Sequence, residues 1–511
     1  MDQPPIQTAE VPSGAFLESV ARLGGGRVLL IGDLMLDETI RGGAERLSPD
    51  APVPVLSVDD EPGSHLREPG GTGNVAACLR ALDTEVEVVG LLGADEPGRY
   101  LREVLAARGC GVDGLVEDPS RPTTVKRSLV GLAQHRHPQK MFRLDIETRR
   151  DADEPQVQAM LAAIDARIDQ VDVVCIEDYA KGTCTEALCQ GVVSRCRDRG
   201  IPLLVDPAAI DDYTRYAGAT AITPNRKETA LASGLQDAGP VDLRQAATMG
   251  EAMRETHGFD RVVLTLDRDG ALLVEGDGVR HLPTEARSVY DVTGAGDMVL
   301  AGMAAGLASG FDWLDAVRTA NLAGGLEVER FGAQPVPLPE VKREALRLFG
   351  GLSGKVRSLD QLLLELEVMR TDGRRIVLTN GCFDVIHAGH VAYLKEARQQ
   401  GDVLVVGVNA DAQVRALKGE DRPIFNEEER LEILEELASV DYLVLFEEPT
   451  AEELISAVLP DVYVKGGDYA PHEIAEHELL ASRNIEIRVL ALRPGLGSSS
   501  IIERIRSVDG R

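Results

Sequence analysis

The chain has 511 residues, with 84 acidic against 54 basic side chains and a formal net charge of −30 at pH 7. That length exceeds one ordinary hydrophobic core and indicates two or three domains. The acidic balance argues against nucleic acid as a partner, because nucleic-acid binding needs a basic surface. No apolar run approaches the ~18 residues of a membrane-spanning helix, so we expect no membrane partner either.

The amino terminus and the cysteines bear on location. The opening residues, MDQPPIQTAE, lack the basic and apolar regions of a secretory signal. The 7 cysteines are scattered and form no CxxC pair, which is typical of free thiols in a reducing compartment. We therefore expect a cytoplasmic protein, with a disordered lead over residues 1–25.

Apolar runs alternate with amphipathic stretches along most of the chain, which predicts parallel sheets covered by helices on both faces. In the first part of the chain the strand-like runs are Val28–Ile31, Val86–Leu92, Val171–Ile176, Pro202–Val205 and Val262–Leu266. The region Arg41–Leu66 has prolines and short alternating runs instead, and it predicts a small antiparallel lid or edge. The fold class is therefore α/β.

A second alternation follows a stretch between about Gly332 and Arg375 in which the pattern weakens. Its strand-like runs are Ile376–Thr379, Val403–Val408, Tyr442–Phe446, Val462–Lys465 and Ile485–Leu490. We predict one domain over residues 26–340, a linker with two amphipathic helices over 341–375, and a second domain over 376–511.

The first glycine cluster, GGTGNVA from Gly70 to Ala76, precedes a helical run. Glycines there let the backbone approach a bound molecule, and Asn74 offers both a donor and an acceptor to a hydroxyl-rich ligand. An ordinary glycine-rich turn explains the same pattern.

The cluster DVTGAGD ends at Asp297 and is followed by the apolar helical run Met298–Leu307. Residues Gly294 to Asp297 are expected at the helix amino terminus, where free amides and the positive dipole end favour a phosphate. Asp297 could take the proton from a substrate hydroxyl as a general base. Alternatively, it is an acidic residue that only favours the helix dipole.

The third cluster, TPNRKE from Thr223 to Glu228, follows a strand-like segment. An Asn and a Glu on a strand-to-helix turn could position a Mg²⁺-bound triphosphate through water. A helix N-cap with a Glu three residues later explains the pattern equally well.

Together and in this order, these clusters resemble the ribokinase/PfkB family of sugar kinases over roughly residues 25–335, along with IGDLMLD on the first strand and Asp206-Pro207. The resemblance implies a ribokinase-like sandwich with a small β lid, ATP as co-substrate, Mg²⁺ bound through the nucleotide phosphates, and Asp297 as the catalytic base. It further implies an anion hole at Gly294, Ala295 and Gly296. Nucleotide contacts are implied at Asn225, Arg226, Lys227 and Glu228, with Glu228 near Mg²⁺. Sugar contacts are implied at Asp33, Asp37, Gly71, Asn74 and Arg143.

In the second domain, TNGCFDVIHAGH follows an apolar strand and opens a helix. His387 and His390 are three residues apart and share a helical face. Beside the amino-terminal amides they can donate hydrogen bonds to an α-phosphate, and Gly389 leaves room for a nucleotide. The alternative is a zinc-binding or structural histidine pair, for which Cys382 is a poor further ligand.

This motif in its strand–turn–helix context resembles the cytidylyltransferase-like nucleotidyltransferases, from about Ile376 to Ile505, and implies a Rossmann-like fold. The roles that it implies are nucleotide contacts at Phe383, Gly389, Lys418, Ser498, Ser499 and Ser500, and substrate contacts at Asp384 and Arg430. Asp384 would orient either the substrate phosphate or the loop itself.

The two halves in tandem, with RPIFNEEER and VKGGDY in the second, resemble the bifunctional heptose enzymes of lipopolysaccharide assembly. The resemblance implies phosphorylation of D-glycero-D-manno-heptose 7-phosphate at O1 and, after a separate phosphatase, transfer of AMP from ATP to heptose 1-phosphate. It also implies sugar phosphates as partners and a homodimer through the kinase lid. Two alternatives stay open: a kinase–nucleotidyltransferase for another sugar or polyol phosphate using CTP or GTP, and a sugar-phosphate-binding regulatory protein on degenerate folds.

Overall fold

The computed structural model describes residues 6–9, 14–59, 61–132, 139–234, 241–284, 292–330, 332–351, 354–467 and 470–491. The chain divides into two units, the first comprising Met1–Val11 and Leu23–Val341 and the second Pro12–Arg22 and Lys342–Arg511. Within the described ranges, no helix combines the length and apolar character needed to cross a bilayer.

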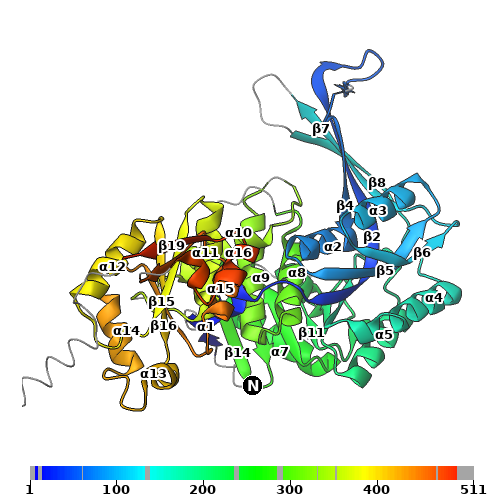
Figure 1. Cartoon of the computed structure of the whole chain (residues 1–511). Helices are drawn as coiled ribbons and strands as arrows, with labels where there is room; N and C mark the ends of the chain where they lie inside the picture. Colours follow the sequence, from blue (N-terminus) through cyan, green and yellow to red (C-terminus); the bar gives the residue numbers. More distant parts are fainter. Residues whose placement is uncertain are drawn as a thin grey trace, which may run out of the picture. The chain divides into compact units, whose positions relative to one another are not determined.

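The first unit is built on one wide, mostly parallel sheet with the order β1-β14-β13-β12-β11-β10-β9-β2-β5-β6. Figure 1 labels β14, β11, β2, β5 and β6 of this sheet. Its strands are β1 (Ile6–Thr8), β2 (Arg27–Leu47), β5 (Glu85–Gly93), β6 (Gly111–Asp118), β9 (Val173–Glu177), β10 (Leu203–Asp206), β11 (Ala221–Ile222), β12 (Arg261–Thr265), β13 (Ala271–Glu275) and β14 (Gly278–Leu282). Only β13 on this path runs antiparallel to its neighbours. Residues Val28–Ile31 are fully buried because helices cover both faces of the sheet.

The helices of this unit lie on the two faces of the sheet. They are α2 (Thr72–Ala81), α3 (Glu96–Ala107), α4 (Glu154–Asp165), α5 (Glu186–Arg199), α6 (Arg226–Ala232), α7 (Leu243–His257), α8 (Ala295–Ala308) and α9 (Trp313–Glu327). Leu29 and Ile31 of β2 share one core cluster with Met160 of α4, Leu188 of α5 and Met253 of α7. Helix α8 packs on α2, α9 and the strands β2, β9 and β10, and so covers the other face.

A lid extends from the main sheet because β2 continues beyond it (Figure 1). The other lid strands are β3 (Pro54–Ser57), β4 (His65–Gly71), β7 (Thr124–Leu132) and β8 (Gln139–Ile146). β2 pairs with β3 and β4 antiparallel and with β7 parallel, and β8 pairs with β7. The predicted lid is therefore present, and it also recruits β7 and β8, which lie outside the predicted span Arg41–Leu66.

The second unit holds a five-stranded, all-parallel sheet with the order β17-β16-β15-β18-β19. The strands are β15 (Ile376–Gly381), β16 (Val403–Asn409), β17 (Tyr442–Phe446), β18 (Val462–Gly466) and β19 (Glu486–Leu490). The helices are α1 (Gly14–Ala21), α11 (Leu359–Thr371), α12 (Ala388–Arg398), α13 (Asp411–Lys418), α14 (Glu427–Glu435), α15 (Glu452–Val458) and α16 (His477–Ser482), and α10 (Leu338–Phe349) spans the division between units. The strand order reverses between β15 and β18, which is the switch point where such sheets bind ligands.

The amino terminus differs from the expected disordered lead over residues 1–25. Residues Gly14–Ala21 form α1, which packs against α11 in the second unit. Phe16 is buried and meets the Phe349 ring edge-on, with 5.4 Å between ring centroids. The apolar side chains at positions 16, 17 and 20 make one helical face, and its burial outweighs the entropy of ordering the segment.

Candidate active sites

Asp297 lies in the first turn of α8 and is buried. The Nδ2 of Asn74 donates to its Oδ2 at 2.6 Å, and the Tyr179 hydroxyl donates to its Oδ1 at 2.9 Å. Burial raises the pKa of Asp297 to about 6, while these two hydrogen bonds oppose the rise. The result is a carboxylate fixed in one orientation that is still mostly ionised at pH 7, as a general base must be.

The residues of the predicted anion hole lie at the amino terminus of α8. Gly294 caps the helix with φ 95°, and a Cβ there would lie 2.8 Å from the Cβ of Ala333. Only glycine fits this position without strain. The first helical amides have no acceptor inside the helix, and they point out of its positive end beside Asp297. The predicted hole at Gly294, Ala295 and Gly296 therefore lies next to the predicted base.

The predicted sugar contacts Asn74 and Asp37 act directly on this base, and the predicted contact Arg143 lies in the lid, where its charge acts on Asp37. Gly71 (φ 53°) precedes α2, which carries Asn74. In the lid, Asp37 pairs in register with Lys126, and Lys126 with Asp145, so these side chains share one face. The Lys126 ammonium lies 4.8 Å from the centre of the Tyr179 ring.

Charges on the same lid face act on Asp37. Burial raises the pKa of Asp37, and Lys126 and Arg143 oppose this. Arg143 itself makes a two-pronged ion pair with Asp145, at 2.8 and 2.7 Å. Lys126 and Tyr179 are functional candidates that were not identified from the sequence. Lid pairing places Lys126 on this face, and the loop after β9 brings Tyr179 to Asp297.

Three further carboxylates lie beside the α8 terminus: Glu177 at the end of β9, Asp206 at the end of β10, and Glu228 in α6. An Oδ of Asp206 lies 3.8 Å from the position of a Cβ on Gly296. Burial raises the pKa values of Glu177 and Asp206. The charge of Asp206 adds to the rise for Glu177, and the charge of Glu228 adds to the rise for Asp206. No role was predicted for Glu177. It could have been identified as a candidate site residue because Glu177 and Asp206 end neighbouring parallel strands, where ligands bind in such sheets.

The TPNRKE segment begins α6 as a capping box. The Asn225 side chain accepts from the amides of Lys227 and Glu228, and one oxygen of Glu228 accepts from the Asn225 amide at 2.9 Å. Arg226 donates to the carbonyls of Val241 and Leu266 and to Asp269, so its guanidinium is engaged within the protein. Lys227 is exposed. The side chains of Asn225 and Arg226 are therefore used within the protein, as the helix N-cap alternative predicts for this segment. Glu228 takes part in the cap and also acts on Asp206 of the carboxylate cluster.

Asp33 requires a correction. Its carboxylate accepts the backbone amides of Tyr179, Lys181 and Thr183 at 2.9, 2.9 and 3.1 Å, and it is buried. Asp33 therefore shapes the loop that presents Tyr179 to Asp297, rather than contacting a sugar.

In the second unit, His387 caps α12 and His390 lies in its first turn. Their rings stack with 4.0 Å between centroids and 24° between planes. The Gly389 amide donates to Nδ1 of His387 at 3.1 Å, which leaves the proton of the neutral imidazole on Nε2. The pair lies at the amino terminus of α12, the position predicted for it, and its role as a donor pair stays a prediction.

The surroundings of His390 favour its neutral form. Burial, with His387 and Lys418 contributing, lowers the pKa of His390 to about 4. Lys418, a predicted nucleotide contact, is exposed at the end of α13, and its positive charge acts on His390. Phe383 packs 5.5 Å from the His390 ring and has a φ of 48°, a strained value for a non-glycine residue. Gly389 is buried in the first turn of α12.

The predicted substrate contact of Arg430 also requires a correction. For Asp384, the structure favours the second of its two predicted roles, orienting the loop. Arg430 is fully buried and donates to the Cys382 carbonyl at 2.6 Å and to Asp411 at 2.7 Å. It therefore positions the loop after β15 and does not reach a substrate. Asp384 accepts the Ile424 amide at 2.5 Å and pairs with Arg422, so it orients the loop.

Two other expectations concern ligands. Ser498, Ser499 and Ser500 lie outside the described residues. Among the residues that are described, no group of three or more His, Cys, Asp or Glu side chains is arranged to hold a metal ion, so the zinc alternative for the histidine pair has no support there.

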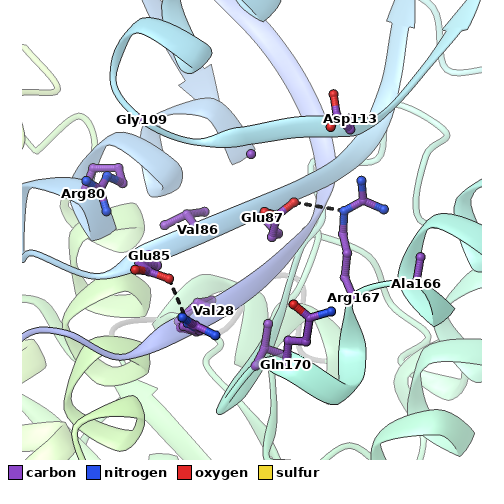
Figure 2. Close-up of a pocket in the computed structure, with 13 residues that line it drawn as sticks. Val28, Arg80, Glu85, Val86, Glu87, Gly109, Asp113, Ala166, Arg167 and Gln170 are labelled. Carbon is purple, nitrogen blue, oxygen red and sulfur yellow. Dashed lines mark hydrogen bonds and ion pairs between the residues drawn. The ribbon is translucent and has the colours of Figure 1, made fainter.

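A polar cavity of about 570 Å³ opens at the amino ends of β2 and β5, the edge of the main sheet opposite to Asp297 (Figure 2). Two of its arginines are already paired, Arg27 with Glu85 at 2.8 Å and Arg167 with Glu87 at 2.9 Å. None of the predicted site residues lines it.

Two family models match the chain. The pfkB family carbohydrate kinase model covers residues 54–341, and the cytidylyltransferase-like model covers residues 378–504. Curated relatives named bifunctional protein HldE align along almost the whole chain. That of Geobacter sulfurreducens is 40% identical over 491 residues, 96% of this chain and 98% of the relative. That of Syntrophotalea carbinolica is 40% identical over 487 residues, 95% of this chain and 97% of the relative.

The chain belongs to the bifunctional HldE family. Membership confirms the predicted α/β tandem of a ribokinase-like and a nucleotidyltransferase domain, and the predicted heptose kinase and adenylyltransferase. The alternative with CTP or GTP is not favoured. Among solved structures, two of phosphofructokinase-2 from Escherichia coli resemble the chain, one in complex with potassium and one with substrates and products. Each has a TM-score of 0.50 and covers 63% of this chain and 99% of its own, and the sequence identities are 17% and 18%. At that identity the likeness concerns the fold alone.

Proposed function

We propose that the first unit transfers the γ-phosphoryl group of ATP to O1 of D-glycero-D-manno-heptose 7-phosphate. The second unit then transfers AMP from ATP to heptose 1-phosphate, releasing pyrophosphate, once a separate phosphatase has removed the 7-phosphate. The product is the ADP-heptose used for the lipopolysaccharide core. The observation that carries the kinase assignment is the buried Asp297, held by Asn74 and Tyr179 at the mouth of the α8 amides.

In the kinase step, the heptose O1 attacks the γ-phosphorus as the bond to ADP breaks, and Asp297 accepts the O1 proton. The α8 amides at Gly294 to Gly296 stabilise the charge on the transferring phosphoryl group. Asn74 and Tyr179 keep the carboxylate aimed at O1. Lys126 and Arg143, on the inner face of the lid, supply positive charge for the sugar phosphate.

The carboxylates beside α8 fit a magnesium ion that is held mainly by the nucleotide. Asp206 and Glu228 repel one another, and a cation between them would relieve that repulsion. Mg²⁺ usually takes one or two carboxylates plus phosphate oxygens and waters rather than a protein cage. When bound, it would neutralise charge on the nucleotide phosphates.

In the adenylyl step, an oxygen of the sugar 1-phosphate forms a bond to the α-phosphorus while the bond to pyrophosphate breaks. Nε2 of His387 and the His390 ring donate hydrogen bonds to the α-phosphate oxygens. Lys418 adds positive charge on the same side. Ser498, Ser499 and Ser500 are proposed to hold the leaving phosphates.

The direct test supplies the chain with heptose 7-phosphate and Mg²⁺-ATP and follows phosphorus-containing products by NMR. We expect heptose 1,7-bisphosphate alone, and ADP-heptose with pyrophosphate when a phosphatase specific for the 7-phosphate is added. Absence of the bisphosphate, or equal use of CTP in the second step, would overturn the proposal.

We also propose a homodimer through the lid. Phe142, Leu144 and Ile146 alternate along β8, so they share one face, and they are 66%, 44% and 38% exposed. That face is opposite to the one bearing Arg143 and Asp145. A second copy would cover this apolar strip. Sedimentation should give a dimer for the unaltered chain and a monomer for Phe142→Asp, whereas a monomeric unaltered chain would contradict the dimer.

We assign both reactions to the cytoplasm, where ATP is available to both sites. All seven cysteines, six of them buried, are free thiols in the structure, as a reducing compartment favours.

A further inference from the structure

Three side chains meet at the switch point of the second sheet, where β15 and β18 end side by side. Asn380 Oδ1 accepts the Tyr463 hydroxyl at 2.6 Å and the Lys465 ammonium at 3.2 Å. Lys465 also donates to the Tyr463 oxygen at 3.1 Å and to Glu476 at 3.2 Å. The sequence analysis gave none of these residues a role.

This network fixes which way the Asn380 amide points. Lysine is only a donor, so the side of the amide facing Lys465 must be the oxygen. The Nδ2 group, with its two protons, is therefore turned away from Tyr463 and Lys465. Asn380 is half-buried at the strand end, and within the described part of the chain Nδ2 has no acceptor. A fixed, unused donor at a switch point is what a ligand oxygen requires.

The same strand ends are tied to the helix that carries the histidines. The Tyr393 hydroxyl of α12 donates to the Val464 carbonyl at 3.1 Å and shares a hydrogen bond of 2.6 Å with Thr379. Thr379 and Val464 directly precede Asn380 and Lys465 in the chain. The subsite and the histidine pair are thus held on one rigid frame.

The two groups lie on different faces of that frame. Leu378 and Tyr463 belong to the core cluster under α11 and α15, whereas Val377 and Val464 belong to the cluster under α12. Because strand side chains alternate, Asn380 and Lys465 lie on the face away from α12. An attacking oxygen must enter in line with, and opposite to, the leaving pyrophosphate. With the nucleotide phosphates at α12, the nucleophile comes from the side of Asn380 and Lys465.

We propose that Asn380 and Lys465 form the subsite for the phosphate of the incoming sugar 1-phosphate, an inference that rests on the proposed adenylyl transfer. Asn380 donates an Nδ2 proton to a phosphate oxygen, and Lys465 neutralises the dianion. Glu476 is the counter-ion that holds Lys465 in place before the substrate arrives, and Tyr463 is a positioning residue that orients the Asn380 amide.

The test measures KM for heptose 1-phosphate and for ATP separately, with kcat, in Asn380→Ala and Lys465→Met. Calorimetry with heptose 1-phosphate alone gives its affinity directly. Lys395→Met is the matched control, because it removes an exposed lysine from α12 in the same unit. Thermal unfolding of each variant reports on folding, and Asn380→Ala decides the matter if Lys465→Met does not fold.

We expect KM and Kd for heptose 1-phosphate to rise about tenfold in Asn380→Ala, the worth of one hydrogen bond to a charged group, and further in Lys465→Met. KM for ATP should not change, and Lys395→Met should resemble the unaltered chain. Unchanged affinity for heptose 1-phosphate, or a rise in KM for ATP instead, would overturn the subsite. If the unaltered chain made no ADP-heptose, the proposed function would fail, and not this subsite alone.

Discussion

The two proposed active sites each lie at the open end of a helix, α8 or α12, but we propose opposite proton chemistry for them. In the first unit, burial raises the pKa of a carboxylic acid, Asp297, to about 6, so that it can accept a proton. In the second, burial lowers the pKa of His390 to about 4, so that it is neutral at pH 7. Burial disfavours the charged form in both cases, and the residue type decides whether the result is a stronger base or a neutral donor.

The sharpest way to break this comparison is Asp297→Asn. The amide keeps the shape but cannot accept the O1 proton, so kinase kcat should fall on the order of 10²- to 10⁴-fold. Steady-state assays of both activities in one preparation check this, with adenylyl transfer as the internal control. Kinase activity near that of the unaltered chain would remove Asp297 as the base.

His390→Ala tests the second site in the same manner. Loss of one donor to the α-phosphate should lower adenylyl transfer about 10²- to 10³-fold. Kinase turnover in the same chain should be unaffected. The pair would lose its proposed role if ADP-heptose still formed at the usual rate from heptose 1-phosphate.

The pH dependence sharpens the contrast. Kinase kcat/KM should fall about tenfold per pH unit below pH about 6, as Asp297 becomes protonated. Adenylyl transfer should have no such limb, because His390 stays neutral until about pH 4. Tyr179→Phe removes a hydrogen bond that lowers the pKa of Asp297, so the kinase limb should move to higher pH. Rate profiles that coincide for the two activities would contradict the account.

The smallest effect concerns Asp33, which is a structural residue here. In Asp33→Asn, an amide replaces one acceptor oxygen facing the loop amides, and the first unit should lose about 1–3 kcal/mol of stability. Urea unfolding of this variant, beside Asp113→Asn at an exposed position of the same unit, measures the difference. Equal midpoints for the two variants would show that the loop does not depend on Asp33.

Much of the fold was predictable because buried parallel strands are nearly continuous apolar runs, and Tyr442–Phe446 was predicted with its observed bounds. The positions of Asp297, His387 and His390 at helix starts were predictable because each lies in a turn that precedes a helical run. Their catalytic roles stay predictions. Asp33 and Arg430 were misassigned because a motif position does not reveal whether a charged group faces a ligand or the loop's own amides. Lys126, Tyr179 and Asn380 were missed because their partners lie in elements distant in the sequence.

The most direct test of two independent sites is a mixing experiment. Asp297→Asn and His390→Ala chains are each given heptose 7-phosphate, Mg²⁺-ATP and the phosphatase, alone and then combined, and ADP-heptose is measured. We expect almost no ADP-heptose from either chain alone and recovery of synthesis in the mixture. Two results would contradict independent sites. One is ADP-heptose synthesis by either chain alone at the rate of the unaltered chain. The other is a mixture that makes no ADP-heptose although Asp297→Asn keeps adenylyl transfer and His390→Ala keeps kinase activity.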